Sequence, residues 1–98
     1  MNGRIETIIS VPPGAVSQDY SNIGANIREA HYAESKKDFV HKLNISLKEC
    51  NESLFWISSI KQCNLIDDPI LKDIERNCFT ILRLLKSAIN TTKEKYNV

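Results

Sequence analysis

Apolar residues recur every three or four positions through most of the chain, which is the spacing of one face of an α-helix. The clearest run consists of Val40, Leu43, Leu47, Cys50, Leu54 and Ile57. A narrow apolar seam of this kind is typical of a helix that packs against other helices. Ser35 and Asp38 stand where a capping box would begin this helix, because the serine hydroxyl can accept a backbone N–H and the acid favours the positive helix end. We therefore expect a helix over residues 35–63.

Two further segments have the same helical spacing. One contains the apolar positions Tyr20, Ile23, Ile27 and Ala30. The other contains Leu71, Ile74, Cys78, Ile81, Leu85 and Ala88. Pro69 precedes this last run and suits the first position of a helix, where its missing N–H costs nothing. We expect helices over residues 17–33 and 68–95, and the short connection before the last helix makes the two long helices antiparallel.

Residues 1–16 have no helical spacing, and the sequence Pro-Pro-Gly at 12–14 would break a helix there. We expect an extended or irregular segment over these residues, followed by a single helical domain over residues 17–98. The predicted fold class is all-α, an antiparallel up-and-down helical bundle. A bundle of three helices leaves an apolar groove, which we expect another chain or the apolar part of the N-terminal segment to cover. That part consists of Ile5, Ile8, Ile9 and Val11.

The composition changes this picture little. The 98 residues include 42% hydrophobic and 26% charged residues, and the net charge is +1. These values fit one folded domain and exclude a disordered chain or a strongly basic protein. The three cysteines, Cys50, Cys63 and Cys78, form no C-x-x-C pair and predict neither a disulfide framework nor a zinc site. No apolar run approaches the roughly 18 residues of a membrane span, so we expect a cytoplasmic protein without a membrane partner.

The sequence offers no recognisable catalytic or metal-binding motif. Glu-x-x-His pairs, glycine-rich phosphate loops, G-x-S-x-G and H-E-x-x-H are all absent. His31 and His41 stand alone, which favours solvated or helix-end histidines over metal ligands. We predict a protein that is not an enzyme and that has no cofactor, no metal site and no small-molecule substrate.

One face of the last predicted helix is basic. Opposite its apolar seam stand Lys72, Arg76, Phe79, Arg83, Lys86 and Lys93. Cations spaced along a helix can follow nucleic-acid phosphates, and an exposed aromatic ring can stack on a base. The alternative is that these cations only solvate the outer face and complement the negative end of the helix dipole. RNA or DNA binding by these six residues is therefore a hypothesis.

A second outward patch lies on the helix predicted over residues 35–63, away from its seam. The patch consists of Ile45, Phe55 and Trp56. Large aromatic side chains are enriched in the cores of interfaces between subunits. The patch is either covered by the N-terminal segment or buried between subunits, and we expect it to be a contact surface of a homo-oligomer.

Three motifs carry a resemblance to a known family. Residues 22–30 read N-I-G-A-N-I-R-E-A, residues 32–39 read Y-A-E-S-K-K-D-F, and residues 48–56 read K-E-C-N-E-S-L-F-W. In this order and spacing they resemble the bacterial "four helix bundle protein" family. That family includes the protein encoded in intervening sequences of the large-subunit ribosomal RNA gene. The resemblance covers about three quarters of the chain, and three ordered motifs are far more specific than one short pattern.

The resemblance implies an up-and-down four-helix bundle that assembles into a ring, typically a pentamer. One branch of the family is the accessory protein of diversity-generating retroelements, a basic barrel thought to bind nucleic acid and a reverse transcriptase. The family has no established catalytic residues and, for most members, no established function. We therefore predict a self-associating, non-enzymatic bundle with a basic face for RNA or DNA. The alternative is a structural or protein-interaction module without a nucleic-acid role.

The motif residues of this chain are Asn26, Glu29, Ser35, Phe39, Glu49 and Glu52. We expect Asn26 and Glu29 to hydrogen-bond the turn and the start of the next helix around Ser35, because helix ends leave backbone groups without partners. The alternative is that these two side chains contact a ligand. Glu49 and Glu52 are predicted to lie on an outward face. Their expected partners are nearby lysines or a neighbouring subunit.

The chain departs from the family pattern at its N-terminal end. Members begin with a first helix, whereas residues 1–16 of this chain lack the spacing of a helix. The second helix of members opens with a basic Q-x-x-R-S-like stretch, whereas residues 17–21 read S-Q-D-Y-S, and Asn22 replaces a serine. We expect that the first helix is missing or replaced because the start is truncated or altered. A longer upstream reading frame would then encode an amphipathic helix.

Overall fold

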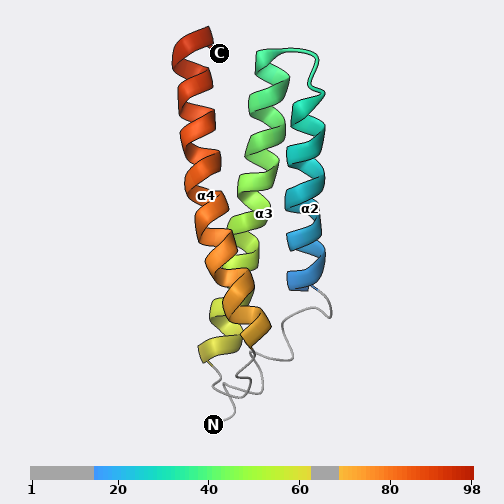
Figure 1. Cartoon of the computed structure of the whole chain (residues 1–98), viewed down its shortest axis with the longest axis vertical. Helices are drawn as coiled ribbons and strands as arrows, with labels where there is room; N and C mark the ends of the chain where they lie inside the picture. Colours follow the sequence, from blue (N-terminus) through green and yellow to red (C-terminus); the bar gives the residue numbers. More distant parts are fainter. Residues whose placement is uncertain (1–14, 63–68) are drawn as a thin grey trace.

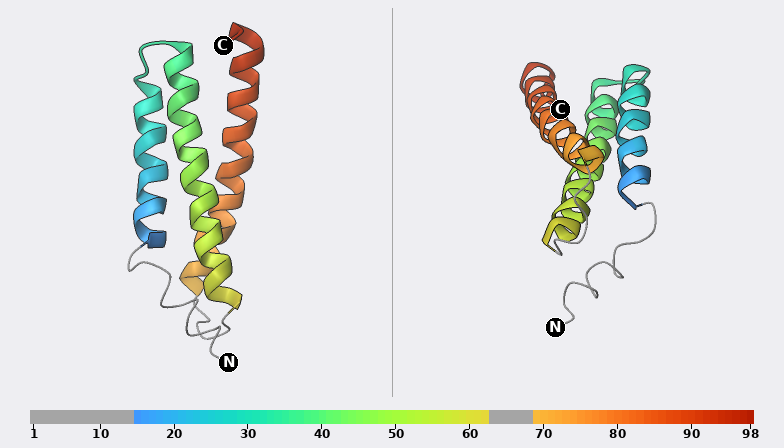
Figure 2. Two further views of the ribbon diagram at one scale, coloured as in Figure 1. Left: turned by 180° about the vertical axis from the view of Figure 1, so that it is seen from behind. Right: turned by 60° about the horizontal axis from the view of Figure 1, so that its bottom comes forward.

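A computed structural model of the chain describes residues 15–62 and 69–98, and these form α2 (Ala15–His31), α3 (Lys36–Gln62) and α4 (Pro69–Tyr96). Consecutive helices run in opposite directions, and α3 lies between α2 and α4 (Figure 1). The same arrangement is visible from behind and from below (Figure 2). The described residues contain no strand, so the predicted all-α bundle fold is confirmed. None of the described helices has the length and apolar character needed to cross a bilayer.

Several expectations concern residues that lie outside the described part of the chain. These are residues 1–14 of the segment expected to be irregular over 1–16, with its apolar residues, the position of a first helix, and the turn at residues 63–68. Ala15 and Val16 of that segment belong to α2, so the helix begins two residues before the predicted start at residue 17. Pro69 is the first residue of α4, as its suitability for a helix start predicts. α2 ends at His31, two residues before the expected end, because the backbone hydrogen bonds beyond it span three residues instead of four. The backbone N–H groups of Tyr32 and Ala33 each donate to the carbonyl three residues earlier.

The start of α3 is fixed by the predicted capping box. The Asp38 N–H donates to Ser35 Oγ at 3.0 Å, and the Asp38 carboxylate accepts the Glu34 N–H at 3.4 Å. Both bonds satisfy N–H groups that a helix start leaves without an internal partner. At the same end of the bundle, the Lys36 ammonium lies 4.6 Å from the centroid of the Tyr96 ring, which joins the start of α3 to the end of α4.

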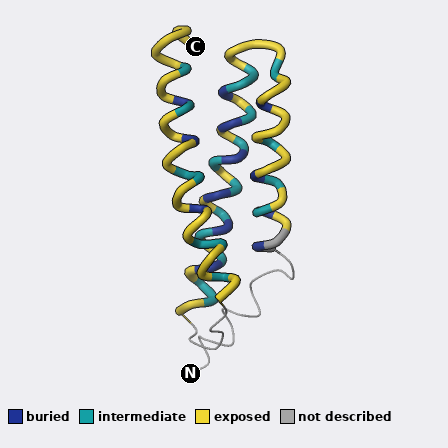
Figure 3. The backbone as a smooth tube through the Cα atoms, viewed as in Figure 1, coloured by how far each residue is buried: buried dark blue, intermediate teal, exposed yellow. Residues whose placement is uncertain are grey.

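The core follows α3, which packs against both of its neighbours (Figure 3). Its cluster of buried side chains consists of Ile23, Ala30, Val40, Leu43, Cys50, Cys78, Leu85 and Ile89. The predicted seam of α3 is partly wrong, because Leu47 and Leu54 are only half-buried whereas Ser46 and Ser53 are fully buried. The Ser46 hydroxyl donates to the Ile23 carbonyl of α2 at 3.0 Å. A small hydroxyl side chain at this position allows α2 to approach α3 more closely than a leucine would.

An apolar groove runs between α2 and α4 over the core, as the three-helix arrangement predicts. The groove has a volume of about 360 Å³. Its most exposed apolar members are Leu84 of α4, with 65% of its surface exposed, and Ile27 of α2, with 38%. Across this side of the bundle, α2 and α4 are joined by a hydrogen bond from Asn77 to the Tyr20 hydroxyl at 3.1 Å.

Candidate functional site

The basic stripe of α4 consists of Lys72, Arg76, Phe79, Arg83, Lys86 and Lys93. All six side chains are exposed. Successive members are separated by four, three, four, three and seven residues, which keeps them on one face of the helix. From Lys72 to Lys93 the stripe is about 32 Å long at 1.5 Å per residue. The structure therefore places together all the residues that the sequence assigned to the basic face.

Not every cation of the stripe is available to a ligand in the same degree. Arg76 forms an ion pair with Asp73, one turn earlier on α4. Arg83, Lys86 and Lys93 make no ion pair with any described residue. Exposed lysine and arginine heads without an acid partner are the groups that best exchange water for phosphate. The C-terminal half of the stripe is therefore its most available part.

The outward patch of α3 divides into two parts. Phe55 and Trp56 contact each other edge to face, with ring centroids 4.9 Å apart at an angle of 66°. Phe55 is 60% exposed, whereas Trp56 is half-buried. The buried Nε1–H of Trp56 has no hydrogen-bond acceptor among the described residues. Ile45 precedes Trp56 by eleven residues, which is about 16 Å along the axis of α3. It therefore forms no continuous patch with the aromatic pair.

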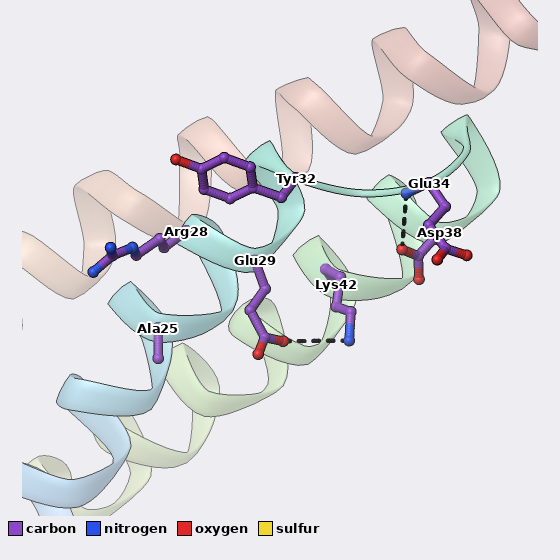
Figure 4. A pocket seen from close by; sticks show the side chains of 7 residues that line it. All are labelled: Ala25, Arg28, Glu29, Tyr32, Glu34, Asp38 and Lys42. Carbon is purple, nitrogen blue, oxygen red and sulfur yellow. Dashed lines mark hydrogen bonds and ion pairs between the residues drawn. The ribbon is translucent and has the colours of Figure 1, made fainter.

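Two of the motif residues make contacts other than those expected. Asn26 donates to the Asn22 carbonyl of its own helix at 2.9 Å and makes no bond to the turn, so that prediction is wrong. Glu29 forms an ion pair with Lys42 of α3 at 3.3 Å. The pair lines an open hollow of about 610 Å³, and Arg28, which also lines the hollow, extends away from the pair (Figure 4). Both side chains are partly exposed, so the pair contributes at most about 1 kcal/mol to stability.

Glu49 and Glu52 do not face outward, contrary to the prediction. Their carboxylates meet the carboxylate of Asp19 of α2, and one oxygen from each of the three groups lies within 4.8 Å of the others. No lysine, arginine or histidine forms an ion pair with any of the three in the described structure. The expected lysine partners are therefore absent, and three acids converge on the contact between α2 and α3. We call this group the carboxylate cluster.

Asp19 is the most unusual member of the carboxylate cluster. Only 7% of its surface is exposed, and its Oδ2 atom accepts no hydrogen bond from any described donor. Burial, the proton that it can share with Glu49, and the negative charges of Glu52 and Glu49 together raise the pKa of Asp19 from 3.8 to about 7, and burial is the largest of these causes. An unpaired charge at this depth is costly, so the cluster favours a bound positive charge.

Sequence reasoning did not single out Asp19, although a signal was present. The positions of α2 that face α3 follow the spacing three, four, three, four through 16, 19, 23, 26 and 30. Val16, Asp19, Ile23 and Ala30 are all buried. Aspartate is rarely buried unless it has a binding partner, so an aspartate within this buried stripe marks a candidate binding site. The apolar members alone do not reveal it, because Tyr20 and Ile27 give an equally regular stripe.

The two described cysteines are packing residues. Cys50 and Cys78 are free thiols with no exposed surface. Burial raises the pKa of Cys50 to about 12 and also raises the pKa of Cys78, an effect that the Ser53 hydroxyl partly offsets. Thiols in this state are protonated at neutral pH and are poor nucleophiles or metal ligands. Cys63 lies outside the described residues.

Comparisons with known proteins place the chain in a family. The sequence profile described as "23S rRNA-intervening sequence protein" matches residues 20–87. A solved structure, a protein of unknown function from the S23 ribosomal protein family of Bacteroides thetaiotaomicron VPI-5482, is 39% identical and has a TM-score of 0.70. The match covers 76% of this chain and 69% of that chain. No curated protein matches the chain.

The matched residues contain the three motifs, α3 and most of α4, including Lys72, Arg76, Phe79, Arg83 and Lys86 of the basic stripe. Asp19 precedes the matched region by one residue. The resemblance inferred from the motifs is thus confirmed both in sequence and in helical arrangement. The chain belongs to the 23S rRNA-intervening sequence protein family.

Proposed function

We propose that this chain is a non-enzymatic, self-associating helical bundle that binds the phosphate backbone of RNA or DNA through the outer face of α4. The observation that carries the proposal is the basic stripe, an exposed row of five cations and one aromatic ring about 32 Å long. Such a row can contact several successive phosphates, and the exposed half of Phe79 offers a surface for stacking on a base.

The position of the stripe also supports the proposal. Ile81 and Ala88, which line the groove, lie about 140–180° around the helix from Phe79 and Arg83 at 100° per residue. A fourth helix or a second subunit seated in the groove would therefore leave the stripe open. A cationic face that would stay exposed in an assembled bundle supports a role in ligand binding, although helix-end solvation accounts for part of its charge.

The salt dependence of binding tests this function. Fluorescence anisotropy would measure the affinity for short RNA and DNA, single-stranded and duplex, between about 50 and 200 mM salt. For the triple variant Arg83→Gln, Lys86→Gln and Lys93→Gln, we expect binding at low salt to weaken about tenfold or more. The slope of log K against log salt should fall by about 3 on duplex DNA, because three phosphate contacts are lost.

A matched control changes the charge equally elsewhere. Arg28, Lys37 and Lys48 are exposed and lie on α2 and α3, so their triple glutamine variant removes the same charge away from the stripe. It should keep nearly the wild-type affinity and slope. Equal weakening by both triple variants would mean that only net charge matters. Absence of salt-dependent binding by the wild type would leave the structural or protein-interaction role in its place.

Self-association through the aromatic pair rests on a separate observation. Trp56 keeps a buried indole N–H without an acceptor, and Phe55 beside it is mostly exposed. A buried donor without an acceptor costs roughly 1–3 kcal/mol, which a carbonyl from a second chain would recover. Tryptophan is also among the residues that contribute most strongly to interfaces. The pair is therefore our candidate for the contact between subunits.

Replacing Trp56 with alanine should lower the molar mass in solution. Light scattering over a range of protein concentrations would measure it for the wild type, for Trp56→Ala and for Phe79→Ala as a control on the exposed aromatic of α4. We expect only the Trp56 variant to dissociate to a smaller assembly, since an interfacial tryptophan commonly contributes about 2 kcal/mol or more. An unchanged mass for that variant would remove the aromatic pair from the interface.

A further inference from the structure

The carboxylate cluster brings three acids together, and no cation of residues 15–62 or 69–98 forms an ion pair with any of them. Asp19 enters from α2 and is more than nine-tenths buried. One of its carboxylate oxygens lies within 4.8 Å of oxygens of Glu49 and Glu52, and its buried Oδ2 atom accepts no hydrogen bond from the described residues. Glu49 and Glu52 come from α3, three residues apart on one face. Two separate helices thus direct anionic oxygens at one point, and one of these oxygens is cut off from water. The missing component is a positive charge at the centre.

We propose that Asp19, Glu49 and Glu52 bind one divalent metal ion, which holds α2 against α3. The spacing fits a single ion. Oxygen ligands lie about 2.0–2.6 Å from Mg²⁺ or Ca²⁺, so two ligands on opposite sides of one ion are up to about 5 Å apart. The three carboxylate oxygens lie within 4.8 Å of one another, and small side-chain rotations bring them into coordination.

The donor set selects the kind of metal. Three carboxylates are hard oxygen ligands, which favour Mg²⁺, Mn²⁺ or Ca²⁺ over the softer ions that seek thiolates and imidazoles. The two described thiols are buried among the apolar side chains of the core, so they would stay out of coordination. Glu49 is only half-buried, so water can complete the coordination shell on the open side.

Trp56 supplies a built-in reporter for this site. It lies four residues after Glu52, so the two side chains share a face of α3 one turn apart. It is also the single tryptophan of the chain, so tryptophan emission reports on this position alone. A paramagnetic Mn²⁺ ion bound in the carboxylate cluster would quench this emission at close range, and the quenching would saturate when the site is full. Quenching by Mn²⁺ that is not bound in the cluster would instead rise linearly with the Mn²⁺ concentration.

The experiment is a titration of the full chain with MnCl₂ at neutral pH, followed by tryptophan fluorescence. We expect saturable quenching in the wild type, reversed by excess Mg²⁺ or Ca²⁺. The variants Asp19→Asn and Glu49→Gln should bind Mn²⁺ at least tenfold more weakly. Glu94→Gln, which removes an exposed acid near the end of α4, should titrate like the wild type. Circular dichroism would show whether each variant keeps the helical fold.

A second readout does not depend on fluorescence. Millimolar Mn²⁺, Mg²⁺ or Ca²⁺ should raise the Tm of the wild type by roughly 5 °C or more, because an ion that binds only the folded state stabilises it by mass action. The Tm of folded Asp19→Asn or Glu49→Gln should rise by less than half as much. Two results would overturn the proposal: quenching that stays linear in Mn²⁺ for the wild type, or equal affinity and equal Tm shifts in the wild type and both cluster variants.

Discussion

Replacing Ile23 with alanine is expected to lower the free energy of unfolding by about 3 kcal/mol. Ile23 is 1% exposed and lies in the core cluster between α2 and α3. Its own carbonyl accepts the Ser46 hydroxyl, so the backbone of α2 is fixed to α3 at this residue and can collapse little into the cavity. Leaving a cavity adds to the lost burial of the side chain. Urea denaturation followed by circular dichroism would measure the change.

Ile27 provides a matched comparison one turn further along the same helix. It carries the same side chain but is 38% exposed at the groove, so Ile27→Ala should cost less than about 1 kcal/mol. A difference of roughly 2 kcal/mol between the two variants is therefore the expected result. Equal losses at both positions would mean that the groove is covered in solution. A loss below 1 kcal/mol at Ile23 would contradict the packing described for α2.

The folded protein should lose stability between pH 5 and pH 8 through Asp19 in a buffer that contains a metal chelator. The pKa of this carboxyl is about 7 in the folded state, because it is buried and faces Glu49 and Glu52 from α3, against 3.8 for an ordinary aspartate. Between these two values the folded state holds a proton that the unfolded state has lost, so stability falls as the pH rises. Over this range we expect a loss of roughly 2–3 kcal/mol from Asp19.

The variant Asp19→Asn isolates this contribution. An asparagine stays neutral, so the variant should be more stable than the wild type at pH 8, and the difference should shrink toward pH 5. Urea denaturation at several pH values would give both profiles, and other titrating groups cancel in their difference. If the two proteins keep the same pH dependence, Asp19 is not the group that carries the proton.

Helical spacing predicted the features that depend on one helix at a time. The three helices, the capping box at Ser35 and the face shared by the basic stripe all follow from positions three and four residues apart. Such local rules hold because side chains on one helix keep fixed angles to one another whatever surrounds the helix. The exposed residues of the basic stripe were therefore all identified from the sequence, whereas Lys95, a further exposed cation of α4, was not among them.

Contacts between helices were beyond the same rules. The apolar pattern of α3 is equally consistent with Leu47 or Ser46 at the centre of the contact, and only the close approach of α2 selects the serine. The carboxylate cluster depends on the rotation of α2 and α3 relative to each other, which spacing within either helix does not fix. Glu49 and Glu52 were consequently placed on the wrong side, and Asp19 was overlooked.

The central position of α3 separates the two proposed sites energetically. The carboxylate cluster lies where α3 meets α2, and the basic stripe lies on the face of α4 that is turned away from the groove. A structural change in α2 would affect α4 chiefly through a deformation of α3, which packs against both helices. The close packing of α3 in the core resists such a deformation. Substitutions in the two sites should therefore act additively, as distant sites without shared partners do. Loss of either proposed site by substitution should therefore leave the other unaltered.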